Sequence, residues 1–430
     1  MKKVKTFSGN QKKWINLQIK IYALIYFTYR LFSGEIKLRY FIRFLKRLLF
    51  FLSQMHHNKY VKIGNKIKIN LYVPAFPTKA FFIACKKVNE FHSKMPCVTA
   101  LVSISSACHF HCNHCYQKYD KGKDLDIKLL ISTVKKMQEN GIAFFNIEGG
   151  EPFIVFDRLI KICEAIDERS EILINSTGDG MTMKNLSELR KHKNIIGIMF
   201  SLHTDKEEEL NQFMGKPDAW EKLENGINLC HKTGFAVMFN TCLQPIAFKD
   251  GTFERILNQA KDFNGSILQL IKPKPAGGWL ESGAAFFNDT DLDHIHKKVN
   301  TYNLSKSYRD YPYIASMFKE EDSSLFGCTA GGTDRFYLNA KGDVQPCEFL
   351  NISFGNVMDN DFDIIYSEMR NIFKTPGNCL LCEKYSAEVL KLYKENNLKT
   401  LPLPCELSEK IYANWERGEP SDFYKKINKI

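Results

Sequence analysis

Six apolar, strand-like segments recur along the middle of the 430-residue chain, with helical patterns between them. They are residues 98–104, 143–147, 172–177, 196–202, 235–243 and 267–271. In the first connection Leu130, Val134 and Met137 form one helical stripe, and Gly141 marks its end. Strands that alternate with helices predict a parallel sheet with helical crossovers. We therefore expect an α/β fold, a partial barrel of six units whose active site lies at the carboxyl ends of its strands.

A dense cysteine run, Cys108-His109-Phe110-His111-Cys112-Asn113-His114-Cys115, directly follows the first strand-like segment. Three thiolates in a C-x3-C-x2-C spacing can hold three corners of a cubane iron–sulfur cluster and leave the fourth iron open to a cofactor. Zinc accepts the same ligand types, and three histidines are interleaved with the cysteines. A zinc site is therefore the alternative that the run alone leaves open.

A second motif, Gly149-Gly150-Glu151-Pro152, follows the second strand-like segment. Two glycines let the backbone approach a ligand closely, and a glutamate can grip an ammonium group. Alone, the motif is more often an ordinary turn. One strand–helix unit after the cysteine run, it becomes a specific signal.

The two motifs, in this order and strand context, resemble those of the radical S-adenosylmethionine (SAM) superfamily over roughly residues 98–275. The resemblance implies a partial (β/α)6 barrel in which Cys108, Cys112 and Cys115 ligate a [4Fe-4S] cluster. It also implies that His114 lies near the adenine of SAM, and that Gly149, Gly150, Glu151 and Pro152 form the loop for its methionine amino group. The implied reaction is reductive cleavage of SAM to a 5′-deoxyadenosyl radical, which abstracts a hydrogen atom from a substrate; the cofactors supply that chemistry.

Further SAM contacts follow from strand position under this resemblance. Ser176 ends the third strand, Ser201 and His203 the fourth, and Asn240 lies on the fifth. Each side chain can touch SAM, and for each a structural hydrogen bond is the alternative. After the sixth strand, the loop Lys272-Pro273-Lys274-Pro275-Ala276-Gly277-Gly278-Trp279 can hold an anionic substrate or the SAM carboxylate. Lysines that simply face water are the alternative there.

A second cysteine set lies at residues 328–405 and comprises Cys328, Cys347, Cys379, Cys382 and Cys405. Between the first two of these cysteines, residues 335–338 and 343–347 are predicted to form a hairpin around Lys341-Gly342. The C-x13-G-x4-C beginning of the set resembles the auxiliary-cluster extension called SPASM, and the missing later cysteines fit the shorter twitch extension better. The resemblance implies that Cys328, Cys347, Cys379 and Cys382 ligate one auxiliary [4Fe-4S] cluster, with Cys405 as a replacement ligand or a bystander. Structural zinc is the alternative. We expect the remaining cysteines to be buried structural residues.

The N-terminal segment is strongly basic, since residues 1–62 hold 14 Lys or Arg and one acid, Glu35, while the rest is near neutral. A nucleic-acid groove in the body is therefore not predicted. Lys20 and Arg30 interrupt a helical pattern at 14–32, so no bilayer-spanning run forms. Residues 41–52 read as a basic amphipathic helix that can lie in a membrane interface, or else pack on the body with a solvated basic face.

No secretory signal is evident, which favours a cytoplasmic protein, with a peripheral place at the inner membrane face as a further option.

Four regions follow from these patterns: a basic helical extension at 1–58, a small subdomain at 59–97, the barrel at 98–302, and a twitch/SPASM-like module with the C-terminal tail at 303–430. In the second region we expect a hairpin around Gly64-Asn65 and a helix at 78–91.

For function, the resemblance favours a radical SAM enzyme acting on a peptide or protein and reduced by a flavodoxin- or ferredoxin-like donor. The same chemistry on a membrane lipid or lipid-linked intermediate is one alternative. A non-catalytic metal-binding or electron-transfer protein is another.

Overall fold

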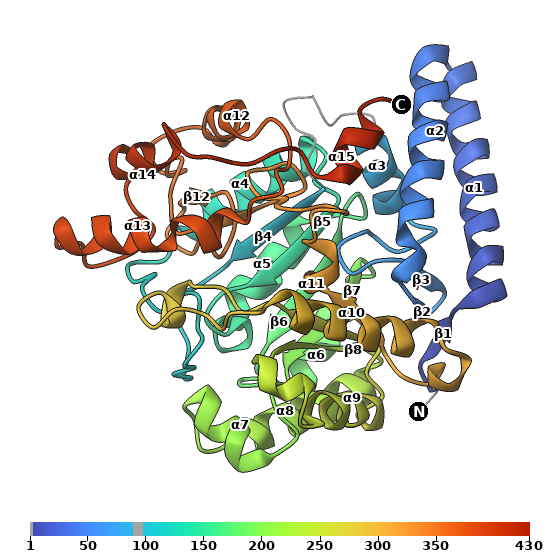
Figure 1. The fold of residues 1–430 in the computed structure, drawn as a ribbon. Helices are drawn as coiled ribbons and strands as arrows, with labels where there is room; N and C mark the ends of the chain where they lie inside the picture. The colour runs from blue at the N-terminus through green and yellow to red at the C-terminus, as the bar shows by residue number, and fades with distance from the viewer. Residues whose placement is uncertain (1–2, 89–97) are drawn as a thin grey trace.

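The computed structural model describes residues 3–88 and 98–430, and its centre is a nine-stranded sheet in the order β10-β9-β8-β7-β6-β5-β4-β11-β12 (Figure 1). All pairings are parallel except that of β11 with β12. The strands are β4 (Thr99–Ser103), β5 (Phe144–Glu148), β6 (Glu171–Ser176), β7 (Ile195–Ser201), β8 (Val237–Cys242), β9 (Ile267–Ile271), β10 (Tyr313–Ser316), β11 (Arg335–Leu338) and β12 (Val344–Gln345). The six predicted strands and the α/β fold class are confirmed.

Three strands extend the sheet beyond the six predicted barrel strands, and two of them, β11 and β12, form the predicted hairpin around Lys341 and Gly342. β10 pairs in parallel with β9, so the sheet continues past the predicted boundary at residue 302. β11, from the cysteine-rich C-terminal region, pairs in parallel with β4, from the start of the barrel. Its place covers an edge of β4 that would otherwise carry unpaired backbone groups.

Crossover helices cover the outer face of the sheet (Figure 1). They are α4 (Ile127–Glu139), α5 (Phe156–Ala165), α6 (Met183–Leu189), α7 (Glu207–Met214), α8 (Ala219–Thr233), α9 (Thr252–Asp262), α10 (Asp289–Leu304) and α11 (Met317–Glu320). Strand side chains alternate between two faces: Phe145 points to the helices, whereas Phe144 joins Val61, Leu71 and Ala75 on the other face. The segment around residues 61–75 thus fills part of the inner face and leaves the carboxyl ends of the strands for the site.

A small antiparallel sheet lies at the N-terminal side of the barrel. It consists of β1 (Lys5–Phe7), β2 (Tyr60–Ile63) and β3 (Lys66–Lys68). The predicted hairpin around Gly64 and Asn65 is confirmed by the pairing of β2 with β3. The predicted helix at 78–91 is observed as α3 (Lys79–Lys87), and the rest of that prediction falls outside the described residues.

The basic extension forms a helical hairpin of α1 (Gly9–Phe32) and α2 (Leu38–Gln54) on one flank of the molecule (Figure 1). The apolar stripe of α2, with Phe44, Leu48 and Leu52, is buried against α1 and the body. The expectation that this stripe enters a membrane interface is therefore wrong, because the stripe is used for packing. No helix among the described residues is long and apolar enough to cross a bilayer.

The C-terminal region packs around β11 and β12. Its helices are α12 (Phe362–Ile372), α13 (Leu381–Glu395), α14 (Cys405–Tyr412) and α15 (Asp422–Ile427). Side chains from this region, including Leu338, Tyr366 and Phe373, belong to the same buried core as the outer face of the barrel. The auxiliary module and the barrel therefore share one hydrophobic core.

Candidate functional site

The C-x3-C-x2-C loop lies between β4 and α4, beyond the carboxyl end of β4. The thiols of Cys108, Cys112 and Cys115 are partly buried and form no disulfide. Burial raises the pKa of Cys108 to about 11, and it also raises the pKa of Cys112, with Cys115 and Cys108 as further causes. Clustered, poorly solvated thiols form thiolates only beside a strong cation, and iron supplies that charge. The donor set therefore fits an iron–sulfur cluster.

The zinc alternative requires ligands that converge on one ion. Within residues 3–88 and 98–430, no group of three His, Cys, Asp or Glu side chains has that arrangement. A cubane cluster takes each thiolate on a different iron and does not need such convergence.

Two glycines bring neighbouring loops against the cysteine loop. A Cβ atom on Gly150 would lie 2.0 Å from the carbonyl oxygen of Ala107, and one on Gly278 would lie 1.9 Å from that of Asn113. The Gly278 N–H also donates to the Cys115 carbonyl oxygen at 2.9 Å. Loops after β5 and β9 thus fix the cysteine loop from two sides, and only glycine permits the approach.

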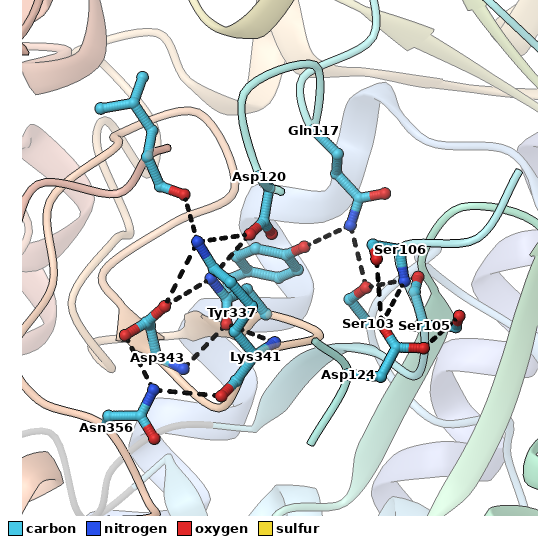
Figure 2. A network of polar contacts seen from close by, with 12 residues as sticks. Ser103, Ser105, Ser106, Gln117, Asp120, Asp124, Tyr337, Lys341, Asp343 and Asn356 are labelled. Carbon is cyan, nitrogen blue, oxygen red and sulfur yellow. Dashed lines mark hydrogen bonds and ion pairs between the residues drawn. The ribbon is translucent and has the colours of Figure 1, made fainter. Parts of the chain in front are cut away.

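A polar network anchors the same loop at both ends (Figure 2). Before the cysteines, the Ser105 hydroxyl and the Ser106 N–H donate to the Asp124 carboxylate at 2.6 and 2.9 Å. After them, the Gln117 amide donates to the hydroxyl oxygens of Ser103 and Tyr337 at 2.9 and 2.7 Å. Because Tyr337 belongs to β11, the auxiliary module helps to position the first cysteine loop.

The network continues into the turn between β11 and β12. Asp120 pairs with Lys341 at 3.1 Å, and the Asn356 amide donates to the Asp343 carboxylate at 3.0 Å. Burial raises the pKa of Asp120 to about 6, and the Lys341 ammonium opposes that effect.

Glu151 is a structural residue here and does not line the site cavity. Its buried carboxylate accepts hydrogen bonds from the Phe153 N–H at 3.0 Å, the Ser176 hydroxyl at 2.8 Å, and the N–H and hydroxyl of Thr177 at 2.6 Å each. These contacts do not support the prediction that this side chain grips an ammonium group, because its acceptor positions are used by the chain. Glu151 ties the loop after β5 to the end of β6; Pro152 begins the short helix η2 (Pro152–Val155) beside it.

A cavity of about 170 Å³ opens at the carboxyl ends of the strands. The structure brings most of the predicted SAM contacts to its wall: His114, Gly149, Gly150, Ser176, Ser201, Asn240 and His203. His114 stacks on Phe213 with ring centroids 4.6 Å apart, and burial lowers its pKa to about 4. A neutral ring in an aromatic cluster is suited to packing against a flat base.

Two buried carboxylates on the cavity wall, Glu148 and Glu348, were missed by the sequence reasoning. The amides of Asn146 and Asn175 each donate to one Glu148 oxygen at 3.0 Å. Burial raises the pKa of Glu148 to about 8, with Glu348 as the next cause. Tyr116 is a further hydrogen-bond partner of Glu148, whereas one Glu348 oxygen is buried with no hydrogen-bond partner among the described residues. The sequence offers one indication of their place in the site, because each lies next to a motif residue: Glu148 precedes Gly149, and Glu348 follows Cys347.

Lys274 connects the cavity to the second cysteine set. It lines the cavity, is buried, and pairs with Glu321 at 2.5 Å and with Glu383 at 2.9 Å. Burial alone would lower the pKa of Lys274, but Glu321, the Cys382 thiol and Glu383 together raise it. Lys272 pairs with Glu383 at 2.8 Å, so the solvated-lysine alternative is wrong for this loop.

Three cysteines of the second set, Cys328, Cys347 and Cys382, interact beside the barrel, and Cys379 lies on a neighbouring segment. The Cys328 N–H donates to the Gly377 carbonyl oxygen at 2.8 Å, which places Cys328 beside the segment that carries Cys379. Burial raises the pKa of Cys382 to about 12, with Cys328 among the further causes, and burial and Cys382 among others raise the pKa of Cys347. These thiols therefore share one electrostatic environment.

Cys405 stands apart from that group. It is exposed at the start of α14, and its thiol interacts with Ser353, Asp343, Glu406 and Glu368 rather than with another cysteine. The bystander alternative is thus favoured over the replacement ligand.

Comparisons with known proteins agree with this geometry. A family model of the radical SAM superfamily matches residues 102–260, and a model of the SPASM iron–sulfur cluster-binding domain matches residues 328–384. The chain is 23% identical over 316 residues to the AdoMet-dependent heme synthase of Oleidesulfovibrio alaskensis, covering 66% of this chain and 79% of that protein. It is 20% identical over 330 residues to the subtilosin biosynthesis protein AlbA of Bacillus subtilis, covering 74% and 66%.

Among solved structures, Streptococcus suis SuiB bound to S-adenosylmethionine superposes with a TM-score of 0.55 and 15% identity, over 76% of this chain and 77% of that one. This similarity concerns the fold. The alternative of a non-catalytic metal-binding or electron-transfer protein is wrong, because the matched superfamily and the curated relatives are enzymes. The chain contains a radical SAM domain and a SPASM domain, and it is an enzyme that uses SAM, a [4Fe-4S] cluster and an auxiliary cluster.

Proposed function

We propose that this enzyme abstracts a hydrogen atom from a peptide or protein substrate bound in the cavity at the carboxyl ends of the strands. The observation that carries the proposal is the meeting of the cysteine loop, the Gly149–Gly150 backbone and the polar strand ends around one cavity. When bound, the cluster and SAM supply a 5′-deoxyadenosyl radical after transfer of one electron from a flavodoxin- or ferredoxin-like donor.

Within this proposal, Cys108, Cys112 and Cys115 hold the first cluster and leave one iron for SAM. The backbone of Gly149 and Gly150 faces the methionine amino group, and His114 packs near the adenine. Ser176, Ser201 and Asn240 lie on the same wall and offer hydrogen bonds to the remaining polar groups of SAM. The chain's own contribution is to orient SAM and exclude water.

The peptide assignment is supported by the polar character of the cavity. The free oxygens of Glu348, Asn146 and Asn175 are buried acceptors that lack a hydrogen-bond partner within the described ranges. Buried acceptors of this kind require donors from a ligand, and peptide N–H groups or an amine are suitable. AlbA carries the name of a bacteriocin biosynthesis protein, and SuiB has been solved with its precursor peptide SuiA at a TM-score of 0.55.

In the C-terminal module, Cys328, Cys347, Cys379 and Cys382 hold an auxiliary [4Fe-4S] cluster in this proposal. Four thiolates leave no iron open to a substrate, so the cluster exchanges electrons rather than binding substrate. Lys274 lines the cavity and interacts with both Cys382 and Glu383, so the cavity and this thiol lie close enough for electron exchange between them.

A lipid or lipid-linked substrate is the second candidate, and one observation favours it. An apolar cavity of about 120 Å³ lies beneath the helical hairpin, lined in part by Leu48, Phe51 and Leu52. Tyr72 and Met317 line both this cavity and the site cavity, so only a thin wall separates them. A lipid whose acyl chain occupies the apolar cavity would place its polar end near the site cavity.

The experiment uses the full chain, reconstituted anaerobically with iron and sulfide, then given SAM and dithionite. Formation of 5′-deoxyadenosine is expected, and Cys112→Ala abolishes it; a fully loaded enzyme that leaves SAM intact contradicts the proposal. Peptide and lipid fractions from deuterium-grown cells that express the chain then identify the substrate class. Deuterium in 5′-deoxyadenosine from the peptide fraction supports the first candidate, and deuterium only from the lipid fraction supports the second.

A further inference from the structure

Helix α1 has an apolar face that the rest of the chain leaves uncovered. Its inner face, with Ile15, Ile19, Ala23 and Phe27, is buried in the hairpin core. A second set of large side chains is exposed on the opposite side; we call it the outer α1 face, and it consists of Trp14, Leu17, Ile21, Ile25, Tyr29 and Phe32. A helix with apolar side chains on two opposite faces is normally covered on both of them.

This exposure is concentrated in one place. Of the seventeen exposed large apolar side chains in the described parts of the chain, eleven lie between residues 14 and 49. Figure 1 shows the hairpin on a flank of the molecule, with α1 outermost. An apolar patch of this kind marks an interaction surface.

The charges around the outer α1 face identify what covers it. Lys13 and Lys20 are exposed, and each stands four residues before an exposed leucine, so they follow the edge of the face. On α2, Arg39, Arg43 and Lys46 are exposed as well. The only acid of residues 1–62, Glu35, is paired with Arg30. An apolar face bordered only by positive charge complements a surface with an apolar interior and anionic headgroups.

We propose that the outer α1 face docks the enzyme onto an anionic phospholipid bilayer, with α1 lying in the plane of the interface. The aromatic content of the face agrees with this position, because Trp and Tyr side chains favour the boundary between headgroups and acyl chains. The helix rests on the bilayer and does not cross it, since Lys20 and Arg30 interrupt its sequence. This docking is independent of the proposed substrate and reaction.

The test is flotation of the reconstituted full chain with vesicles of phosphatidylcholine alone or of phosphatidylcholine and phosphatidylglycerol at a ratio of 7:3. Binding is expected to the anionic vesicles and to fall with added salt. The double variant Ile21→Gln/Ile25→Gln should lose at least tenfold in partition coefficient, because two apolar side chains leave the interface.

A matched control makes the same two changes elsewhere. Ile246→Gln/Ile364→Gln alters side chains that are 62% and 54% exposed, compared with 44% and 64% for Ile21 and Ile25. This control should bind vesicles as the parent does. Lys13→Gln/Lys20→Gln should weaken binding by more than tenfold at low salt, since each basic side chain near an anionic surface contributes roughly fivefold.

Three results would overturn the proposal. The first is absence of binding to the anionic vesicles by the folded, SAM-cleaving enzyme. The second is equal binding by the Ile21→Gln/Ile25→Gln variant and its control. The third is a dimer in light scattering that the Ile21→Gln/Ile25→Gln change converts to a monomer, because the face would then be covered by a second copy of the chain.

Discussion

Replacement of Glu151 by alanine should destabilise the barrel and loosen the SAM site together. The carboxylate accepts four hydrogen bonds, two of them from the fixed backbone N–H groups of Phe153 and Thr177. The hydroxyl donors can rotate toward other acceptors, whereas the two N–H groups cannot. Each buried donor left unpaired costs about 1–3 kcal/mol, so Glu151→Ala should lose about 2–6 kcal/mol.

Thermal unfolding and SAM titration of the reconstituted enzyme measure the two effects. A loss of this size lowers the Tm of a domain of barrel size by roughly 5 °C or more. Glu151→Gln keeps one acceptor oxygen but places an NH2 group against a donor, so it should show an intermediate loss. Glu168→Ala, which removes an exposed carboxylate, is the control and should leave both measurements unchanged.

The outcome that refutes this reasoning is specific. If Glu151→Ala keeps the parent Tm but binds SAM far more weakly, the carboxylate contacts the SAM ammonium directly and does not act by holding the turn at residues 176–177.

Three further outcomes follow from the site and its surroundings. Gly278→Ala should prevent loading of the first cluster and leave about four irons in the auxiliary site, because its Cβ would meet the Asn113 carbonyl oxygen. Gly283→Ala strains only its own backbone, at φ +75°, and has open space around it, so it should load normally; equal iron contents in the two variants would contradict the role of Gly278 in holding the cysteine loop. Cys405→Ser should retain the parent iron content, and a loss of about four irons would make Cys405 a ligand. Burial lowers the pKa of His57 to about 3, so the native state binds fewer protons than the unfolded state and stability is lost as pH falls below 6.5. Between pH 7.5 and 5.5 this loss is about 1.4 kcal/mol by the linkage relation, and urea unfolding of His57→Leu should lack it; an unchanged pH slope would disprove it.

The barrel was predictable because its signal is local. Each strand is a short apolar run between helical patterns, and all six predicted strands were observed. The strand β10 escaped prediction because Tyr313–Ser316 follows the long helix α10, outside the alternation. The hairpin of β11 and β12 was predicted, but the place of β11 beside β4 was not. The partners of β10 and β11, which are β9 and β4, are specified by tertiary structure rather than by neighbouring sequence.

Site residues that belong to a motif could be predicted from the sequence. The roles of residues that depend on their buried surroundings could not. Cavity-lining residues such as Gly149 and Ser176 follow from motif and strand position. The structural role of Glu151 and the ion pairs of Lys274 depend on which donors and carboxylates surround them, which spacing does not reveal. Similarly, an amphipathic pattern predicted α2 but could not say that α1 would occupy its apolar face.

The pairing of β11 with β4 can form only late in the synthesis of the chain. β4 ends at Ser103 and its outer neighbour begins at Arg335, so about 230 residues must be synthesised before that edge is covered. At ribosomal rates of 5–20 residues per second the delay is roughly 10–50 s. During this time a nascent barrel displays an open strand edge beside its cysteine loop, which is a hazard for aggregation. We therefore expect chaperones to bind the chain before residue 335 emerges from the ribosome. Cluster insertion is expected after that point.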